Sequence, residues 1–466
     1  MSGHLPSEKS AFPVPNSTLP FWRTEVHELD NHRSTEQLPT ECDVAIIGAG
    51  YAGVSTAYHL LDGNAPPCSI VILEARQACS GATGRNGGHL RPDFASSAEH
   101  IERYGAAAAA EILRFETSHI PAIRDIIRRE DIDCNFVLTK SLAVLLDEDD
   151  ARHAKDAYSK LVESGVASSD EVQFVVGNDA ELASGVKGAK GCLSYNAGHL
   201  WPYKFIVQLL AIVVAKGANL QTNTPVLHVS ESRDSKGLWT LTTARDSVKA
   251  KNVVFASNGY TSAIAPQYSQ KVVPVRGICS RIVTPDDRPP PHMVYTYAIS
   301  QTSGRFDYLI PRADGSIIVG GAKQVFLADR HHWYDVADDS QLIEPAKYYF
   351  DGYMQRTFTG WEDSGAYTDK VWTGIMGYTS DSLPHIGEVP GKPGQFILAG
   401  FNGHGMPVIF LSAKGIAQMI RDGKLYEQSG LPKLFRTSRE RLESTENEIL
   451  NTPALKERSV PDGSAQ

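Results

Sequence analysis

The sequence has few cysteines and no long apolar run, and each absence excludes a class of protein. Its six cysteines are scattered along 466 residues without the Cys-x-x-Cys spacing of a metal or redox pair, which predicts reduced thiols in an intracellular, cytoplasmic protein. The most apolar stretch, residues 205–215, is too short to span a bilayer and contains Gln208. Residues 1–20 are polar and rich in proline and serine, unlike a secretory signal peptide. We therefore expect a soluble protein without a membrane partner.

Basic residues are outnumbered by acidic ones, 45 against 54. The net charge is −9 and no basic stripe runs along the chain, which predicts no nucleic-acid partner. His331 and His332 are adjacent, but no ligand spacing surrounds them, so we expect no metal site. What the sequence does have is 42% hydrophobic residues, enough for a large core, in a chain whose length suggests about two or three domains.

The most informative segment is a glycine-rich turn between two apolar runs, in residues 42–74. Gly48 lets the chain turn off a strand, Gly50 leaves room for a pyrophosphate, and Gly53 lets the next helix pack on that strand. The free N–H groups at the start of that helix attract phosphate. Glu74 ends the second run, where a carboxylate can accept hydrogen bonds from ribose hydroxyls. The segment predicts a dinucleotide-binding βαβ unit, and by itself it leaves FAD, NAD and NADP open.

The pattern along the rest of the chain predicts further helices and strands. We expect a long helix at residues 104–129, short strands over 271–330, and a final helix that ends near 420 after a second glycine-rich turn. This order predicts an α/β fold in which a Rossmann-like nucleotide-binding domain receives an inserted α+β substrate domain. The expected parts are a lead-in at 1–40, a cofactor domain at 41–90, 190–270 and 366–426, a substrate domain at 91–189 and 271–365, and a tail at 427–466.

Five segments, in this order, resemble the D-amino-acid oxidase, sarcosine oxidase and glycine oxidase family of FAD-dependent amine oxidoreductases. They are residues 48–53, 80–88, 198–202, 372–387 and 400–406. The run Gly-Arg-Asn-Gly-Gly at 84–88 is most similar to the gamma-glutamylputrescine oxidoreductase branch. Each motif alone is weak, but the set is specific and covers roughly residues 20–425.

The resemblance implies the fold, the cofactor and the reaction. It implies a Rossmann-like FAD-binding domain and a substrate domain with a mixed antiparallel sheet plus helices. It also implies oxidation of a C–N bond of an amine or N-substituted amino acid by hydride transfer to flavin N5. Hydrolysis of the imine would follow, with O2 as the expected electron acceptor. Met376 stands where some members attach flavin through cysteine, so the FAD is expected to be non-covalent.

The residues that the resemblance implies to bind FAD have small side chains or offer backbone groups. For each glycine considered alone, an ordinary turn is the alternative interpretation. Val226 matches the position of backbone contacts to the adenine, and the turn at 400–405 would offer N–H groups to the N1–C2=O side of the flavin. The implied set is Gly48, Gly50, Tyr51, Ala52, Gly53, Glu74, Ala75, Gly81, Ala82, Thr83, Gly84, Arg85, Asn86, Gly87, Gly88, His89, Val226, Ser257, Asn258, Gly259, Gly374, Met376, Asp381, Gly400, Asn402, Gly403, Gly405 and Met406.

Three residues are candidates on the substrate side. Arg91 falls near an arginine that holds a substrate carboxylate in sarcosine-oxidase-like members, although a surface arginine is an equal alternative. Tyr308 matches a tyrosine that faces the flavin in family members, and a core aromatic is the alternative interpretation. His404 would polarise flavin or substrate, or else hold its turn in place. His89 belongs to the cofactor set above, although it could contact either flavin or substrate.

Besides Met376, two further positions depart from the family pattern. Pro407 replaces a lysine that forms the second carboxylate clamp, and Ile318 replaces an oxygen-activating lysine. The alternative is therefore an FAD-dependent dehydrogenase or tailoring enzyme that acts on a larger amine with an acceptor other than O2. A flavin reductase or monooxygenase that uses NAD(P)H would need a second nucleotide site, and a non-catalytic FAD-binding scaffold is the remaining alternative.

Overall fold

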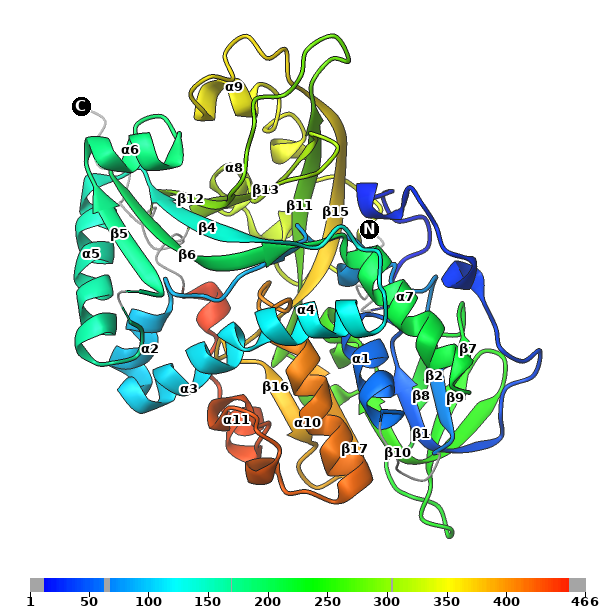
Figure 1. Ribbon diagram of the computed structural model, residues 1–466. Coiled ribbons are helices and arrows are strands. Elements are labelled where there is room, and N and C mark those ends of the chain that lie inside the picture. The colour runs from blue at the N-terminus through cyan, green and yellow to red at the C-terminus, as the bar shows by residue number, and fades with distance from the viewer. Residues whose placement is uncertain (1–11, 63–67, 169, 303–304, 452–466) are drawn as a thin grey trace, which may run out of the picture.

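The computed structural model describes residues 12–62, 68–168, 170–302 and 305–451, and in them two sheets organise the chain (Figure 1). The eight strands of the first sheet are β1 (Glu41–Ile47), β2 (Ile70–Leu73), β7 (Asn219–Gln221), β8 (Val226–Val229), β9 (Trp239–Thr243), β10 (Ser247–Phe255), β16 (His385–Glu388) and β17 (Gln395–Ala399). β1 lies between β2 and β10, with which it runs parallel. β7 and β17 extend the parallel sheet, while β16, β9 and β8 add antiparallel strands.

The first sheet is covered on both faces, because alternate residues of β1 belong to different cores. Val44 and Ile46 pack in the core that contains helices on one face of the sheet. These helices are α1 (Tyr51–Leu60), α7 (Pro202–Ala215) and α10 (Ile409–Asp422) (Figure 1). Ala45 and Ile47 pack on the other face with residues of β8 and β9. A strand segment buried on both faces is a continuous apolar run, as residues 44–47 of β1 show.

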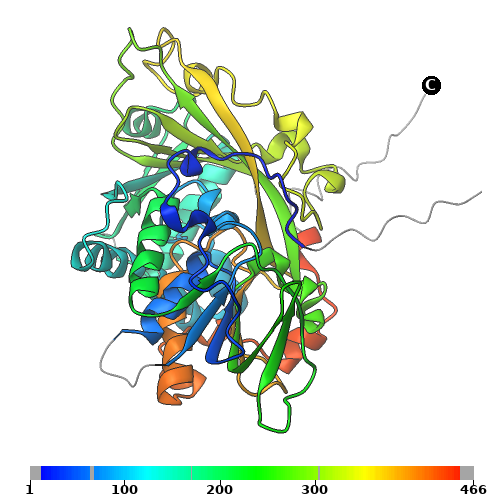
Figure 2. The same cartoon turned by 90° about the vertical axis from the view of Figure 1, so that its right-hand side faces the viewer.

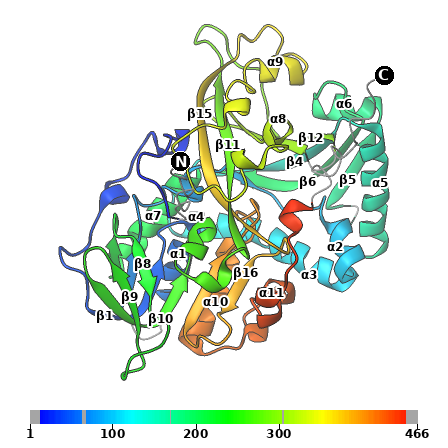
Figure 3. The ribbon, with the colours of Figure 1, turned by 180° about the vertical axis from the view of Figure 1, so that it is seen from behind.

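The second sheet is mixed and mostly antiparallel. Its nine strands in the described residues are β3 (His89–Leu90), β4 (Val137–Leu145), β5 (Val172–Val176), β6 (Gly191–His199), β11 (Val272–Val283), β12 (Thr296–Thr302), β13 (Arg305–Pro311), β14 (Ile317–Gly320) and β15 (Tyr367–Thr379). The long pair of β11 and β15 reaches down toward the first sheet (Figures 1 and 3). β12 and β4 form a parallel pair within it.

The remaining helices range from four to 16 residues. They are α2 (Ser97–Tyr104), α3 (Ala106–Thr117), α4 (His119–Arg129), α5 (Glu148–Glu163), α6 (Asn178–Ser184), α8 (Lys323–Phe326), α9 (Tyr353–Thr357) and α11 (Arg439–Glu443). Among them, α3 and α4 pack into the same core as α1, α7 and α10. The prediction of one helix over residues 104–129 is wrong. Gly105 has a φ of 83° and separates α2 from α3, and Pro121 in the first turn of α4 has no N–H to continue the hydrogen bonds of α3.

The sheets do not follow the domain boundaries expected from the sequence at every point. β6 and β15 pair with β4 and β11 in the second sheet, although their residues fall in segments assigned to the cofactor domain. The division into domains stays a prediction. Within the described residues, no helix has the length and apolar character needed to cross a membrane.

Both ends of the described chain pack against the body of the protein. The N-terminal segment runs over both sheets (Figure 2): Thr18 donates its N–H to the carbonyl of Asp339, and Ser34 donates to Leu220 in β7. Trp22 in this segment is fully buried. The C-terminal segment passes β16 (Figure 3), where Thr437 donates to Ile386, and returns to the second sheet.

Candidate active site

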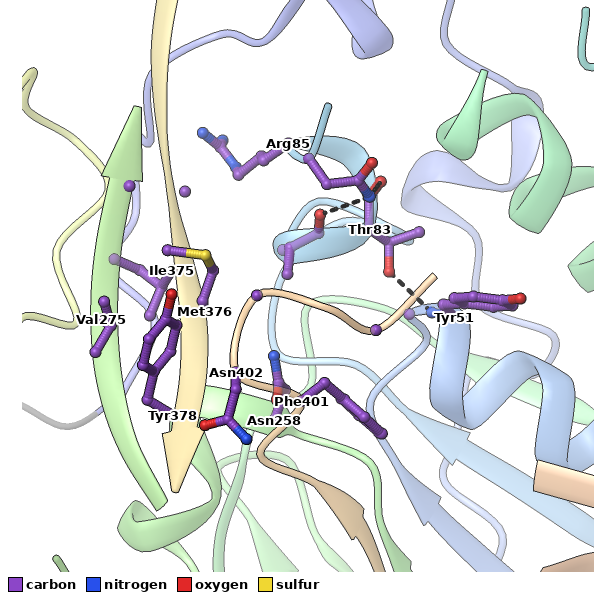
Figure 4. A pocket seen from close by; sticks show the side chains of 18 of the residues that line it. Tyr51, Thr83, Arg85, Asn258, Val275, Ile375, Met376, Tyr378, Phe401 and Asn402 are labelled. Carbon is purple, nitrogen blue, oxygen red and sulfur yellow. Dashed lines mark hydrogen bonds between the residues drawn. The ribbon is translucent and has the colours of Figure 1, made fainter. Parts of the chain in front are cut away.

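A cavity of about 570 Å³ follows the glycine-rich turns of the chain. Its wall contains parts of the β1–α1 turn, residues 81–83 and 85–87, and parts of the turn between β17 and α10. Residues of β11 and β15 form another side, among them Val275, Ile375, Met376 and Tyr378 (Figure 4). One continuous space thus connects segments that lie far apart in the sequence.

The β1–α1 turn is as tight as its glycines suggest. Gly48 has a φ of 114°, and a Cβ on it would lie 2.7 Å from the carbonyl oxygen of Ala256. A Cβ on Gly53 would lie 1.9 Å from the carbonyl oxygen of Gly48, so only glycine lets α1 begin so close to the strand. Thr83 meets this helix start, where its hydroxyl accepts a 2.8 Å hydrogen bond from the N–H of Tyr51 (Figure 4).

Glu74 follows β2 and is held in place by backbone groups. One carboxylate oxygen accepts a hydrogen bond from the N–H of Ala49 at 2.8 Å, and the other accepts one from the N–H of Arg76 at 2.9 Å. Each carboxylate oxygen can accept a further bond. Glu74 lines the cavity, and contact of its carboxylate with ribose hydroxyls stays a prediction.

A buried ion cluster supports the same wall. Asp339 is fully buried, and its carboxylate accepts hydrogen bonds of 2.8 and 3.0 Å from Arg76 and lies 3.3 Å from Nε of Arg85. Arg85 also donates to the carbonyl of Thr373 at 2.8 Å. Burial lowers the pKa of Arg85 to about 10, while Asp339 opposes the shift. The guanidinium of Arg85 is therefore committed to internal contacts, although the residue lines the cavity.

Tyr308 forms a flat wall of the cavity between two glycines. A Cβ on Gly87 would lie 2.4 Å from its ring, and a Cβ on Gly320 would lie 2.2 Å from it. Its hydroxyl lies 3.1 Å from Sγ of Cys279. Burial raises the pKa of Tyr308 well above its usual value, so the phenol stays neutral.

Two asparagines tie the turn between β17 and α10 to β15 and to the segment after β10 (Figure 4). Asn258 accepts the N–H of Gly400 at 3.0 Å, and Asn402 accepts the N–H of Thr379 at 2.7 Å. The N–H of Gly400 is thus taken, which corrects the expectation that it faces a flavin. Gly403 and Gly405 line the cavity, and their N–H groups have no hydrogen-bond partner in the described part of the chain. Contact of these two amides with the N1–C2=O edge of a flavin stays a prediction.

His404 lies in this turn beside a buried acid that the sequence analysis did not single out. Its Nε2 is 3.2 Å from a carboxylate oxygen of Glu116 on α3. The same oxygen accepts the N–H of Asp93 at 2.7 Å. Burial lowers the pKa of His404, but Glu116 and Asp93 more than offset it, and the net shift is upward.

Two cations, Arg91 and Lys323, also line the cavity. Arg91 donates to the hydroxyl of Tyr195 at 2.8 Å, and its guanidinium carbon lies 6.0 Å from the ring centre of Phe306. Lys323 opens α8, and its ammonium nitrogen lies 5.5 Å from the centre of the same ring and 3.4 Å from the hydroxyl of Tyr378. Among the described residues, neither cation has an ion-pair partner.

Most residues that the sequence singled out lie on this cavity. The three substrate-side candidates, Arg91, Tyr308 and His404, all line it. The expected cofactor residues on its wall are Gly48, Gly50, Tyr51, Ala52, Glu74, Ala75, Gly81, Ala82, Thr83, Arg85, Asn86, Gly87, His89, Val226, Ser257, Asn258, Gly374, Met376, Asn402, Gly403, Gly405 and Met406. Their contacts with a cofactor stay predictions.

The other expected residues lie behind the wall or away from it. They are Gly53, Gly84, Gly88, Gly259, Asp381 and Gly400. A Cβ on any of these glycines would come within 2.6 Å of a neighbouring atom, so they allow wall segments to pack closely. Asp381 forms hydrogen bonds of 2.6 and 2.9 Å with Arg441, so its carboxylate serves a structural ion pair instead of the cavity.

Sequence reasoning missed several charged residues of the site. Lys323 follows the Gly320–Gly321 turn at the end of a strand, a signal that could have found it. Asp93 lies two residues after Arg91 and also lines the cavity. Glu116 had no signal, because an acid on a helix is usually a solvated side chain.

Comparison with known proteins identifies the family. The family model for DAO, described as FAD dependent oxidoreductase, matches residues 43–419. The chain belongs to the DAO family. This DAO-family chain is 25% identical over 397 residues to gamma-glutamylputrescine oxidoreductase of Escherichia coli strain K12, covering 82% of the chain and 84% of that relative. It is 24% identical to glycine oxidase of Bacillus licheniformis over 388 residues, or 81% of the chain and 92% of the relative.

Solved structures show the same fold. The crystal structure of glycine oxidase from Geobacillus kaustophilus aligns with a TM-score of 0.70 and 19% identity, covering 86% of this chain and 99% of that one. L-proline dehydrogenase from P. horikoshii aligns with a TM-score of 0.65 and 18% identity, covering 83% and 95%. The resemblance, the α/β fold, the enzyme class and FAD as cofactor are thereby confirmed: the chain is an FAD-dependent oxidoreductase.

Proposed function

We propose that this DAO-family enzyme oxidises a C–N bond of an amine or N-substituted amino acid. The observation that carries the proposal is that one cavity joins the phosphate-binding turn and Glu74 to Arg91, Lys323 and His404. Ionisable side chains at the cofactor's reactive end are suited to a small charged substrate. The two relatives named above support the substrate class, since both are named for substrates that contain nitrogen.

Arg91 and Lys323 suggest that the substrate also carries a carboxylate. Both cations lie over Phe306, and neither forms an ion pair with a described residue, so each can still pair with an anion. Asp93 and Glu116 act on the charge of Arg91 without such a contact. Arg91 comes from the segment after β3, and Lys323 comes from α8. In the family pattern the second cation stands at the position of Pro407. Here Lys323 on α8 would supply that second cation instead. A carboxylate held by both would orient the amine.

The chemistry of oxidation belongs to the cofactor, and the protein supplies orientation and charge. Bound FAD would take up the hydride from the carbon next to the substrate nitrogen, and the resulting imine would hydrolyse in water. Tyr308 would limit the space beside the flavin ring, because its own ring fills the room that Gly87 and Gly320 leave by having no Cβ. The amides of Gly403 and Gly405 would stabilise negative charge at the ring's edge.

An electron acceptor other than O2 is the second candidate, and Ile318 favours it. The side chain of Ile318 is fully buried in β14 and packs in the main core with Ile310. It therefore places no cation beside the cavity at this strand position. On this alternative the enzyme would be a dehydrogenase or tailoring enzyme for a larger amine.

The test of the function is an anaerobic screen of amines on the purified, flavin-containing enzyme. Candidate substrates are N-alkyl amino acids, γ-glutamyl amines and polyamines, and the readout is loss of the flavin's visible absorbance. Reduction by at least one amine is expected, with carboxylate-bearing amines fastest. If none of these amines reduces the flavin, the proposed substrate class is wrong. Hydrogen peroxide release compared with dye reduction, using the same substrate, then separates an oxidase from a dehydrogenase.

A further inference from the structure

His404, on the cavity wall, and its neighbour Glu116 are both held in place by hydrogen bonds. His404 is fixed by its turn, since its N–H donates to the carbonyl of Phe401 at 2.7 Å. Glu116 is only 5% exposed and is anchored by the N–H of Asp93. Nε2 of His404 lies 3.2 Å from this carboxylate, an ion-pair contact in which the N–H is not yet aligned with the oxygen. A small rotation of the imidazole would align it.

The geometry defines which ring nitrogen is available for chemistry. The carboxylate of Glu116 favours a proton on Nε2 of His404, because a carboxylate only accepts hydrogen bonds. Nδ1 then carries a free electron pair, and no described residue forms a hydrogen bond with it. His404 lines the cavity between Gly403 and Gly405, so its imidazole is beside the space for the flavin and substrate.

The charges around His404 come from several elements. Glu116 lies on α3, Asp93 and Arg91 lie in the segment after β3, His89 lies in β3, and His119 lies in α4. Burial keeps both neighbouring histidines neutral, since it lowers the pKa of His119 to about 4 and that of His89 well below its usual range. Two acids therefore face His404 against one cation.

We propose that His404 accepts a proton from the substrate's ammonium group at Nδ1, and that Glu116 is a positioning residue that stabilises the imidazolium formed. This step rests on the proposed function. The N–H bond of the ammonium breaks, its electron pair stays on nitrogen, and the proton moves to Nδ1. The substrate becomes a neutral amine, whose electron pair can assist loss of hydride from the adjacent carbon. A buried carboxylate supports a histidine base in the same way in other enzymes.

The test compares the wild type with Glu116→Gln and His404→Asn, and uses Glu111→Gln as the control. Glu111 lies on the same helix, and its exposed carboxylate contacts the N–H of Lys433 instead of the cavity. The first readout is an NMR titration of the histidine rings in holoenzyme with labelled histidine, where loss of a signal in His404→Asn assigns His404. The second readout is the pH dependence of anaerobic flavin reduction by the amine found in the screen.

We expect His404 to titrate above its ordinary pKa in the wild type and Glu111→Gln, and at lower pH in Glu116→Gln. The rate of flavin reduction should rise with pH through the same value and shift with it in Glu116→Gln. The amine's own pKa is unchanged between variants, so it cannot cause that shift. His404→Asn should lose this rise and reduce the maximal rate by about 100-fold, the lower end of general-base effects.

Three results would overturn the proposal. One is a His404→Asn enzyme that keeps the pH-dependent rise, and another is a Glu116→Gln enzyme in which neither the titration nor the rate profile moves. The pH profile of flavin reduction in Glu116→Gln decides the matter even if His404→Asn does not fold, because it needs no assigned histidine signal. The third is a wild type whose flavin is reduced by no amine. That result would overturn the proposed function as well, whereas the first two results would overturn this step alone.

Discussion

The ammonium group of Lys323 is held by aromatic rings and by the turn before it. Its nitrogen lies 5.5 Å from the ring centre of Phe306 and 5.7 Å from that of Tyr378. The buried carboxylate of Asp307 accepts the N–H of Ala322 at 2.8 Å and a hydrogen bond from the hydroxyl of Tyr349 at 2.6 Å. Asp307 thereby fixes the turn that presents Lys323 to the cavity.

Replacing Lys323 by methionine should weaken binding of carboxylate-bearing amines alone. The side chain keeps its length and its contact with the aromatic rings but loses its charge. A charge-assisted contact contributes about 1.5–3 kcal/mol, so KM for such amines should rise by roughly 10- to 100-fold. KM for amines without a carboxylate should stay unchanged. Steady-state kinetics with a matched pair of amines measures this, and the exposed Lys414→Met on α10 is the control. An equal rise in KM for both amines would refute the carboxylate role.

One buried carboxylate joins four parts of the chain: the N-terminal segment, the end of β2, the loop at residues 80–88, and β15. Asp339 pairs with Arg76 and Arg85, Arg76 also donates to the carbonyl of Val14, and Arg85 donates to that of Thr373 in β15. These elements line the same cavity as the proposed cofactor site. Loss of this carboxylate would leave two buried cations short of a partner, which is costly.

Asp339→Asn should therefore destabilise the holoenzyme by about 3–5 kcal/mol and loosen FAD. The neighbouring Asp338→Asn is the matched control: Asp338 is partly exposed and accepts the N–H of Ser340 at 2.8 Å, so its loss should cost only about 1 kcal/mol. Chemical unfolding gives the free energies, and the flavin retained after gel filtration gives cofactor binding. Equal stability of the two variants would contradict the role given to Asp339.

The sequence predicted elements with a local signal and missed those that depend on distant partners. The β1–α1 turn was predicted down to the steric role of Gly53, because each glycine follows from local geometry. The helix at 104–129 was wrong because an apolar stripe continues across Gly105 and Pro121 without showing the break. Glu116 could not be found because its partner His404 lies on another element far along the chain.

Burial of histidine is spread over the whole molecule and not confined to the active site. His59, His119, His199 and His385 are all buried, and they belong to α1, α4, β6 and β16. Burial is the first cause in each case: it lowers the pKa to about 4 for the first three and to about 3 for His385. The native protein therefore holds these rings neutral over a pH range in which an unfolded chain would protonate them.

Stability should consequently fall steeply as the pH drops from about 6.5 toward 4. In this window the unfolded state binds more protons than the native state, so the free energy of unfolding rises with pH and is lost on acidification. Each buried histidine contributes up to about 1.4 kcal/mol per pH unit. Urea unfolding at several pH values measures the slope. His119→Gln should reduce that slope by one histidine's share, even though loss of its hydrogen bonds with Phe115 and Leu411 lowers stability at every pH. The exposed His228→Gln should leave the slope as it is. A slope that is the same in His119→Gln and the wild type would show that His119 is not held neutral by the fold.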